Sequence, residues 1–192
     1  MHVGNPKGFT LIELVIGIMV LSIALMLFTS LLIPQAGRSV DPIFQVRATE
    51  LAKSIMIEIT SKAFDEKSSH TVTGDRCNEN GIACTSSDKL GVDGTENRTT
   101  FNDIDDYHGL NESAGGIIKN ALDQLNTIDG QDLYQGFLAD VSVVYDDNFN
   151  GVDDSDIIEQ GIIVTGNTKL ITVTITTPNS EAMIFSTYKL NY

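Results

Sequence analysis

The stretch "KGFTLIELVIGIMVLSIALMLFTSLLIP", Lys7–Pro34, decides how the rest of the chain is organised. Residues 9–33 form an apolar run with a single carboxylate, Glu13, inside it. About 20 consecutive apolar residues cross a bilayer as a helix, and residues 14–33 supply that length without any charge. We therefore expect residues 9–33 to be a transmembrane helix.

The flanks of this run predict its orientation. An ordinary signal peptide has an apolar core of about 7–15 residues followed by a small-residue cleavage site, whereas this run is longer and no such site follows it. Lys7 immediately precedes the run, which places the N-terminus in the cytoplasm, although Arg38 on the far side weakens this bias. We expect a single pass with residues 35–192 outside the cytoplasm.

Glu13 is an acidic residue inside the predicted membrane span, which is energetically unfavourable and so requires an explanation. A carboxylate in the hydrocarbon centre costs about 2.5–3.5 kcal/mol on insertion scales, and acids within membrane helices are usually functional. The alternative is a carboxylate that reaches back to the membrane interface, because Glu13 lies near the start of the run. The residues around it favour a functional role.

A short polar leader, the pair Lys7–Gly8, then Phe9 and then Glu13 stand in fixed order in "KGFTLIELV". This stretch resembles the processing site of type IV prepilins and of type II secretion pseudopilins. The resemblance implies that residues 1–8 are a leader, that prepilin peptidase cleaves between Gly8 and Phe9, and that Phe9 is N-methylated. Glu13 would then neutralise the new N-terminal amine of a neighbouring subunit, since a paired charge in low dielectric is far less costly than an unpaired one.

Further stretches extend the resemblance. "LLIPQAGRSVDPIFQVRATELAKSIMIEITSKAFDE", "FNDIDDYHGL" and "LITVTITTP…FSTYKLNY" are similar to minor pilins of the mannose-sensitive haemagglutinin type. Such a subunit begins in the inner membrane and then enters a pilus at the cell surface. Its partners would be prepilin peptidase, other major and minor pilins and the inner-membrane assembly platform. A type II secretion pseudopilin is an alternative, as is an uncleaved, membrane-anchored periplasmic enzyme or calcium-binding module.

A second helix is predicted after the span. Pro34 should kink or stop the first helix, and it stands later than the helix-breaking proline that many members of this family carry. Asp41 and Pro42 suit the N-cap and first position of a helix, which should end near Phe64. Its expected apolar stripe comprises Ile43, Val46, Leu51, Ile55 and Ile59. We expect a helical region over residues 9–64.

Residues 65–192 should form a globular head. Residues 65–135 read as loops with a short helix around Gly116–Leu125. Alternating patterns predict strands at 137–145, 161–165, 169–177 and 181–190, the last two joined as a hairpin by the turn "PNS". The predicted fold is therefore α+β and type IV pilin-like: a long N-terminal helix, half membrane span and half amphipathic, packed through Leu51, Ile55 and Ile59 on a C-terminal antiparallel sheet.

Charge and cysteine content narrow the function. The net charge is −14, from 26 acidic and 12 basic residues, and no basic stripe is present, which argues against nucleic-acid binding. Cys77 and Cys84 lie in the short polar loop "CNENGIAC". Outside the cytoplasm such a pair favours a disulfide, because a metal site would need two further ligands that are not evident.

An acidic loop is a candidate for calcium. Asp146, Asn148 and Asn150 with Gly151 match the opening of an EF-hand loop, and Asp154 stands at its ninth position. The twelfth position is not the expected glutamate, and no flanking helix is predicted, so the loop is not an EF-hand. Weak extracellular calcium binding by Asp146, Asn148, Asn150 and Asp154 is one hypothesis, and a solvated loop is the other.

The segment "FNDIDDYHGL" gathers Asp103, Asp105, Asp106 and His108. Metal binding or acid–base chemistry is conceivable, but a turn in which Asp side chains bond nearby amides, with Tyr107 packed inward, is favoured. Nucleophile, metalloprotease and phosphate-loop motifs are absent from the sequence. We predict a structural protein that is not an enzyme and needs no cofactor apart from the calcium hypothesis.

Overall fold

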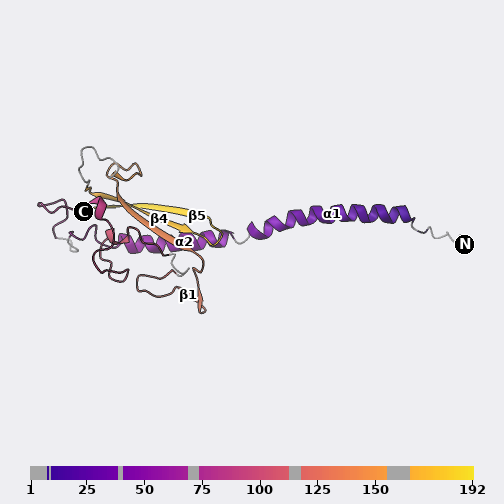
Figure 1. Cartoon of the computed structure of the whole chain (residues 1–192), viewed down its shortest axis with the longest axis horizontal. Helices are drawn as coiled ribbons and strands as arrows, with labels where there is room; N and C mark the ends of the chain where they lie inside the picture. The colour runs from indigo at the N-terminus through magenta and orange to yellow at the C-terminus, as the bar shows by residue number, and fades with distance from the viewer. Residues whose placement is uncertain (1–7, 9, 39–40, 69–73, 113–117, 155–164) are drawn as a thin grey trace. The chain divides into compact units, whose positions relative to one another are not determined.

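Figure 1 shows a computed structural model of the chain. The chain divides into two compact units, Met1–Ile43 and Phe44–Tyr192. The structure describes residues 8, 10–38, 41–68, 74–112, 118–154 and 165–192, with the backbone alone for 31–38 and 41.

The first unit contains helix α1 (Leu11–Arg38), so the helix predicted for the apolar run is confirmed. The backbone stays helical through Pro34, and the helix ends four residues later, at Arg38. Of the two predicted outcomes at Pro34, a kink or a stop, the stop is wrong, and the kink stays a prediction. A proline removes a single amide donor, and a long helix retains its other hydrogen bonds on both sides of that gap.

Helix α2 (Asp41–Thr60) begins at the predicted Asp–Pro pair. Its buried face differs from the expected stripe, because Ile43 and Val46 are exposed while Ala48 and Ala52 are buried. The rest of the stripe is confirmed, since Leu51, Ile55 and Ile59 are all buried. The small alanine side chains let the helix lie close to its neighbours, which the apolar pattern alone does not reveal.

The end of α2 lies at Thr60, four residues before the predicted end at Phe64. Hydroxyls of Thr60 and Ser61 donate to the carbonyls of Met56 and Glu58, at 2.7 and 2.6 Å, which weakens the helical ladder. The amide of Ala63 then donates to Asn102 instead of to a helical carbonyl. Competing backbone partners outside the helix therefore end it early.

The region between α2 and the main sheet is mostly loops, as predicted. It contains two single 3-10 turns, η1 (Ser87–Lys89) and η2 (Asp105–Tyr107), and a small hairpin of β1 (Thr127–Ile128) and β2 (Gln131–Asp132). The helix predicted at Gly116–Leu125 is wrong over its described part, residues 118–125. There the Asn120 carboxamide oxygen accepts the amides of Leu122 and Gln124, which closes a turn instead.

Three antiparallel strands form the main sheet: β3 (Leu138–Tyr145), β4 (Thr168–Thr176) and β5 (Ala182–Leu190), in the order β3-β4-β5. The predicted hairpin of the last two strands is confirmed, with Thr176 opposite Ala182 at its closed end. Of the strand predicted at 161–165, residues 161–164 lie outside the described residues, and Thr165 is not in a strand.

The core of the second unit joins α2 to the sheet. Figure 1 shows α2 running along β4 and β5. The cluster includes Leu51 and Ile55 from α2, Val143 and Val173 from the sheet, and Tyr107, whose hydroxyl donates to Glu58 of α2. The predicted α+β arrangement, with a helix packed on an antiparallel sheet, is confirmed.

Candidate functional site

The predicted processing site lies immediately before α1. Gly8 is exposed, and a side chain added to it would meet no atom within 4 Å. Phe9 lies outside the described residues. Thr10 opens the helix, because its hydroxyl accepts the amide of Glu13 at 3.4 Å and its carbonyl accepts the amide of Leu14 at 3.3 Å. Glu13 therefore stands in the first helical turn, where the helix dipole favours a negative charge.

The surface of α1 from Leu11 to Ser30 is apolar on all sides. Leu11–Ser30 is long and apolar enough to cross a membrane, and none of its side chains is buried. Its three hydroxyls, on Ser22, Thr29 and Ser30, donate to helix carbonyls at 2.8–2.9 Å. Since every hydroxyl is satisfied within the helix, Glu13 is the one polar side chain of this segment whose needs must be met by the surroundings.

Residues 4–29 match the family model of the prokaryotic N-terminal methylation motif. The match contains Gly8, Phe9 and Glu13 and most of the apolar span. It supports a type IV pilin or pseudopilin-like protein, hence a structural subunit rather than an enzyme, and fits a membrane-anchored precursor. The methylation motif implies processing by prepilin peptidase and assembly with other pilins. Neither the curated proteins nor the solved structures give a match to the chain.

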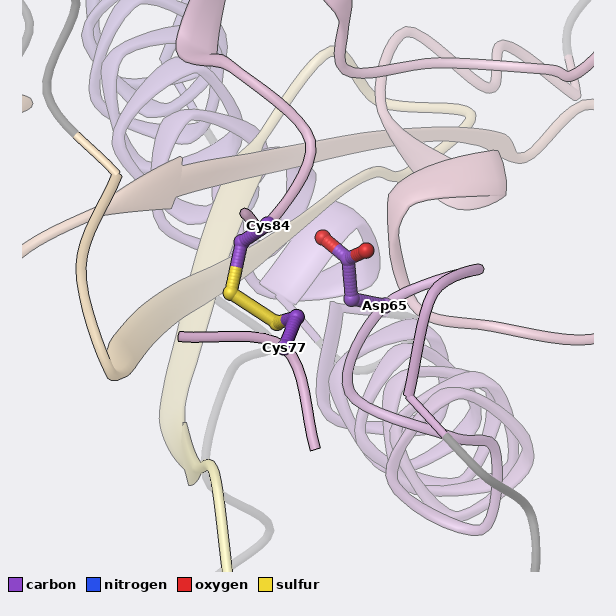
Figure 2. Close-up of side chains that lie close together, drawn as sticks. All are labelled: Asp65, Cys77 and Cys84. Carbon is purple, nitrogen blue, oxygen red and sulfur yellow. A yellow bond between two sulfur atoms is a disulfide. The ribbon is translucent and has the colours of Figure 1, made fainter. Parts of the chain in front are cut away.

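The head contains the predicted disulfide. Cys77 and Cys84 are bonded to each other and are both buried. Figure 2 shows Asp65, from the loop after α2, beside this bond, with a carboxylate oxygen within 4.8 Å of both sulfur atoms. Sulfur atoms in a disulfide supply no thiolate to a metal, so this trio is a structural contact.

Asp65 belongs to a buried ionic cluster that also contains Lys169 and Asp105. The Lys169 ammonium donates to Asp65 at 3.3 Å, to the carbonyl of Phe64 at 2.9 Å and to Asp105. It also lies 4.4 Å from the centre of the Phe64 ring. Side chains of Lys169 and Asp65 are fully buried, so the pair is shielded from screening by salt.

One lysine cannot neutralise two carboxylates, and the structure distinguishes them. Asp65 also accepts the amides of Lys67 and Thr85 and the Thr85 hydroxyl. Burial alone would raise the pKa of Asp65, but Lys169 and these amides hold it below its usual value. Burial raises the pKa of Asp105 to about 8 against the attraction of Lys169, and one of its oxygens has no partner. We therefore assign the charge to Asp65 and the proton to Asp105 at neutral pH.

The segment "FNDIDDYHGL" forms the favoured turn. Asp103 accepts the amides of Asp105 and Asp106 at 2.7 and 3.2 Å, and Tyr107 is fully buried. The His108 ring contacts the backbone of Val143 in β3 rather than a carboxylate. The proposed His–Asp chemistry therefore has no geometry to support it here.

Arg98 ties this turn region to α2. Its guanidinium makes two hydrogen bonds to Glu58, at 2.8 and 3.0 Å, and one to Glu112 at 2.9 Å. The Tyr107 hydroxyl donates to the same Glu58 at 3.0 Å. Burial would lower the pKa of Arg98, but bonds to Glu58 and Glu112 raise it. This cluster is built to fix the loops against the helix.

The candidate calcium loop directs its oxygens toward its own backbone. Asp146 is buried and accepts the amides of Asn150 and Gly151, at 3.0 and 2.8 Å, and the Tyr188 hydroxyl at 2.8 Å. Asp154 accepts the side-chain amide of Asn148 at 2.6 Å. The structure thus brings the four predicted residues together in one loop, and calcium binding by them stays a prediction.

Sequence reasoning missed the role of Lys169, although a signal was present. In the alternating pattern of β4, Lys169 shares its parity with Ile171, Val173 and Ile175, which are all buried. A lysine in phase with core residues indicates a buried cation, which in turn requires a buried acid. Asp65 and Asp105 could not be identified as its partners, because they lie 104 and 64 residues away in the chain.

Proposed function

We propose that this chain is a minor type IV pilin of the mannose-sensitive haemagglutinin type, a structural subunit that enters a pilus through α1. The observation that carries the proposal is the position of Glu13 in the methylation motif, as the one ionisable residue of the apolar segment Leu11–Ser30 of that helix. Such a helix needs a surrounding that is apolar over its length and positively charged at one point. A bundle of processed pilin helices meets both requirements.

The chemistry of assembly follows from this arrangement. Cleavage after Gly8 gives Phe9 a free amine, which the peptidase then methylates without removing its positive charge. The amine of one subunit and the Glu13 carboxylate of its neighbour neutralise each other in low dielectric, where either charge alone is costly. The pairing rewards one axial register between adjacent helices, because any slip separates the charges.

The precursor is proposed to span the inner membrane once, with its N-terminus inside and residues 35–192 outside. Lys7 precedes the span, and the Cys77–Cys84 disulfide suits an oxidising compartment. After extraction from the membrane by the assembly platform, the head would lie at the pilus surface. The other major and minor pilins are its partners there.

Assignment to one subunit, the D subunit of that pilus type, rests on the similar stretches quoted above. A type II secretion pseudopilin carries the same motif and remains the alternative. The two differ in phenotype: deletion of the gene should reduce surface pili in the first case and protein secretion in the second. Either phenotype without the other decides between them.

Mass spectrometry of the chain purified from its native membrane tests the proposal. The expected N-terminal peptide begins with methylated Phe9. A Gly8→Val variant is the matched control, because a side chain at the small residue before the scissile bond should leave the precursor uncut. A wild-type chain that retains Met1 in cells with active peptidase would overturn the proposal.

A further inference from the structure

Three carboxylates from separate parts of the head meet in one group. Glu66 follows α2, Asp93 lies between η1 and η2, and Asp103 lies two positions before the start of η2. One oxygen of each lies within 4.8 Å of the other two. Glu66 and Asp93 are exposed, whereas Asp103 is 1 % exposed. The group therefore has a buried wall and an open side toward solvent.

The carboxylate of Asp103, on the buried side of the group, is only partly hydrogen-bonded. One of its oxygens accepts the two amides of the η2 turn, and the other is buried with no hydrogen-bond partner. A buried acceptor without a partner costs about 1–3 kcal/mol, and more when it is charged. The adjacent Asn102 and the nearby Glu96 each have a buried oxygen in the same condition. Among the residues that the structure describes, the buried side-chain atoms without a partner are these three and one oxygen of Asp105, and all four are acceptors, which favours a missing cation over a missing anion.

The electrostatics agree with this geometry. A further carboxylate, Asp106, lies beside the group, where it accepts the amides of Asp93, Asn102 and Asp103 at 3.4, 3.0 and 3.4 Å. The nearby ammonium of Lys169 is already held by Asp65 and Asp105. The group repels itself, and a divalent cation would relieve that repulsion.

We propose that Glu66, Asp93 and Asp103 bind one calcium ion. Hard oxygen ligands suit calcium, and two ligands on opposite sides of it stand about 5 Å apart, so three oxygens within 4.8 Å of one another can share one ion. Magnesium needs stricter octahedral geometry, which three carboxylates from separate segments are less suited to provide. Water completes the coordination on the open side. The ion ties the end of α2 to the loops around η2, at a place separate from the acidic loop at 146–154.

Calcium binding to the full-length protein in detergent micelles tests this site. After treatment with EDTA, flow dialysis with radioactive calcium measures the ions bound per chain. We expect a dissociation constant of about 10⁻⁴–10⁻³ M, as in other extracellular calcium modules. Glu66→Gln and Asp93→Asn should each raise that constant at least tenfold. Both residues are exposed, so these variants keep the fold.

Two variants make the assignment specific. Asp88→Asn removes an exposed carboxylate outside the group and should bind calcium as the wild type does. Asp146→Asn disables the other acidic loop and should leave the ion at Glu66, Asp93 and Asp103 in place. The proposal is overturned if the wild type binds no calcium at 10 times the upper expected constant. It is equally overturned if Glu66→Gln and Asp93→Asn both bind as the wild type, or if Asp146→Asn alone removes all bound calcium.

Discussion

The two units of the chain differ in whether their charged side chains have partners of opposite charge within the same unit. In the head, Lys169 is buried and Arg98 is largely buried, and each has its acidic partners within the same unit. In α1, the side chain of Glu13 has no partner among the residues that the structure describes, and the apolar side chains of Leu11–Ser30 are exposed. The charges of Lys169 and Arg98 are neutralised by other residues of the head. The exposed apolar side chains of Leu11–Ser30 instead need lipid or other apolar helices around them.

Removal of the one charge in the segment Leu11–Ser30 should have the largest effect. Glu13→Val leaves the neighbouring amine unpaired in low dielectric, and an uncompensated buried charge costs about 3–5 kcal/mol. We expect normal cleavage and methylation but at least a tenfold loss of the subunit from purified pili. Quantitative immunoblots of the pilus and membrane fractions measure this ratio.

Ile12→Val is the matched control, because it alters the neighbouring residue without changing charge. It should enter pili like the wild type. Normal incorporation of the Glu13→Val chain would show that the carboxylate is not needed for register, and the contrast between the two units would lose its functional meaning.

Removal of the buried cation in the head should have the next largest effect. Lys169→Met keeps most of the side-chain volume but leaves the Asp65 carboxylate buried without its ammonium. We expect the free energy of unfolding to fall by about 3–5 kcal/mol, measured by urea denaturation of the full chain in micelles with near-ultraviolet circular dichroism. Lys189→Met is the control, since that ammonium donates to the Thr60 carbonyl and is only partly buried. A loss below about 1 kcal/mol for Lys169→Met would mean that the cluster is not a stabilising ion pair.

The same contrast explains what the sequence could predict. The span needs only composition and length, and the strands β3, β4 and β5 follow from local alternation, so both were predictable. The ionic cluster depends on pairing Lys169 with Asp65 across 104 residues, which no local pattern encodes. The end of α2 and the turn at Asn120 were missed for a related reason. There, side chains compete with the helical ladder for backbone groups, and periodicity of apolar residues does not register that competition.

The disulfide should contribute less than the ionic cluster. Cys77 and Cys84 are separated by seven positions, and closing so short a loop removes about 2–3 kcal/mol of unfolded-chain entropy. The double substitution Cys77→Ala and Cys84→Ala should lower the free energy of unfolding by that amount. Dithiothreitol should destabilise the wild type similarly and leave the double variant unchanged. If the reductant destabilises both proteins equally, the bond is not the source of the effect.

The smallest expected effect is a dependence of head stability on pH. Asp103 and Asp105 have pKa values raised to about 7 and about 8 by burial, above the unfolded value near 4. Between these limits the folded chain holds protons that the unfolded chain has released, so the free energy of unfolding falls as pH rises from about 4 to 8. Asp65 has a lowered pKa and acts in the opposite direction, because its contribution is lost as pH falls below about 4.

Asp105→Asn isolates the contribution of Asp105 to this pH dependence, because the amide resembles the protonated acid and keeps an oxygen that can accept from Lys169. The variant should have a flatter stability profile between pH 5 and 9 and be more stable than the wild type at pH 9. Asp103 still titrates, so some slope remains, and exposed Asp88→Asn should follow the wild type. An Asp105→Asn profile parallel to the wild type would mean that Asp105 is ionised in the folded head. Lys169 would then face two negative charges, and the assignment of the charge to Asp65 alone would fail.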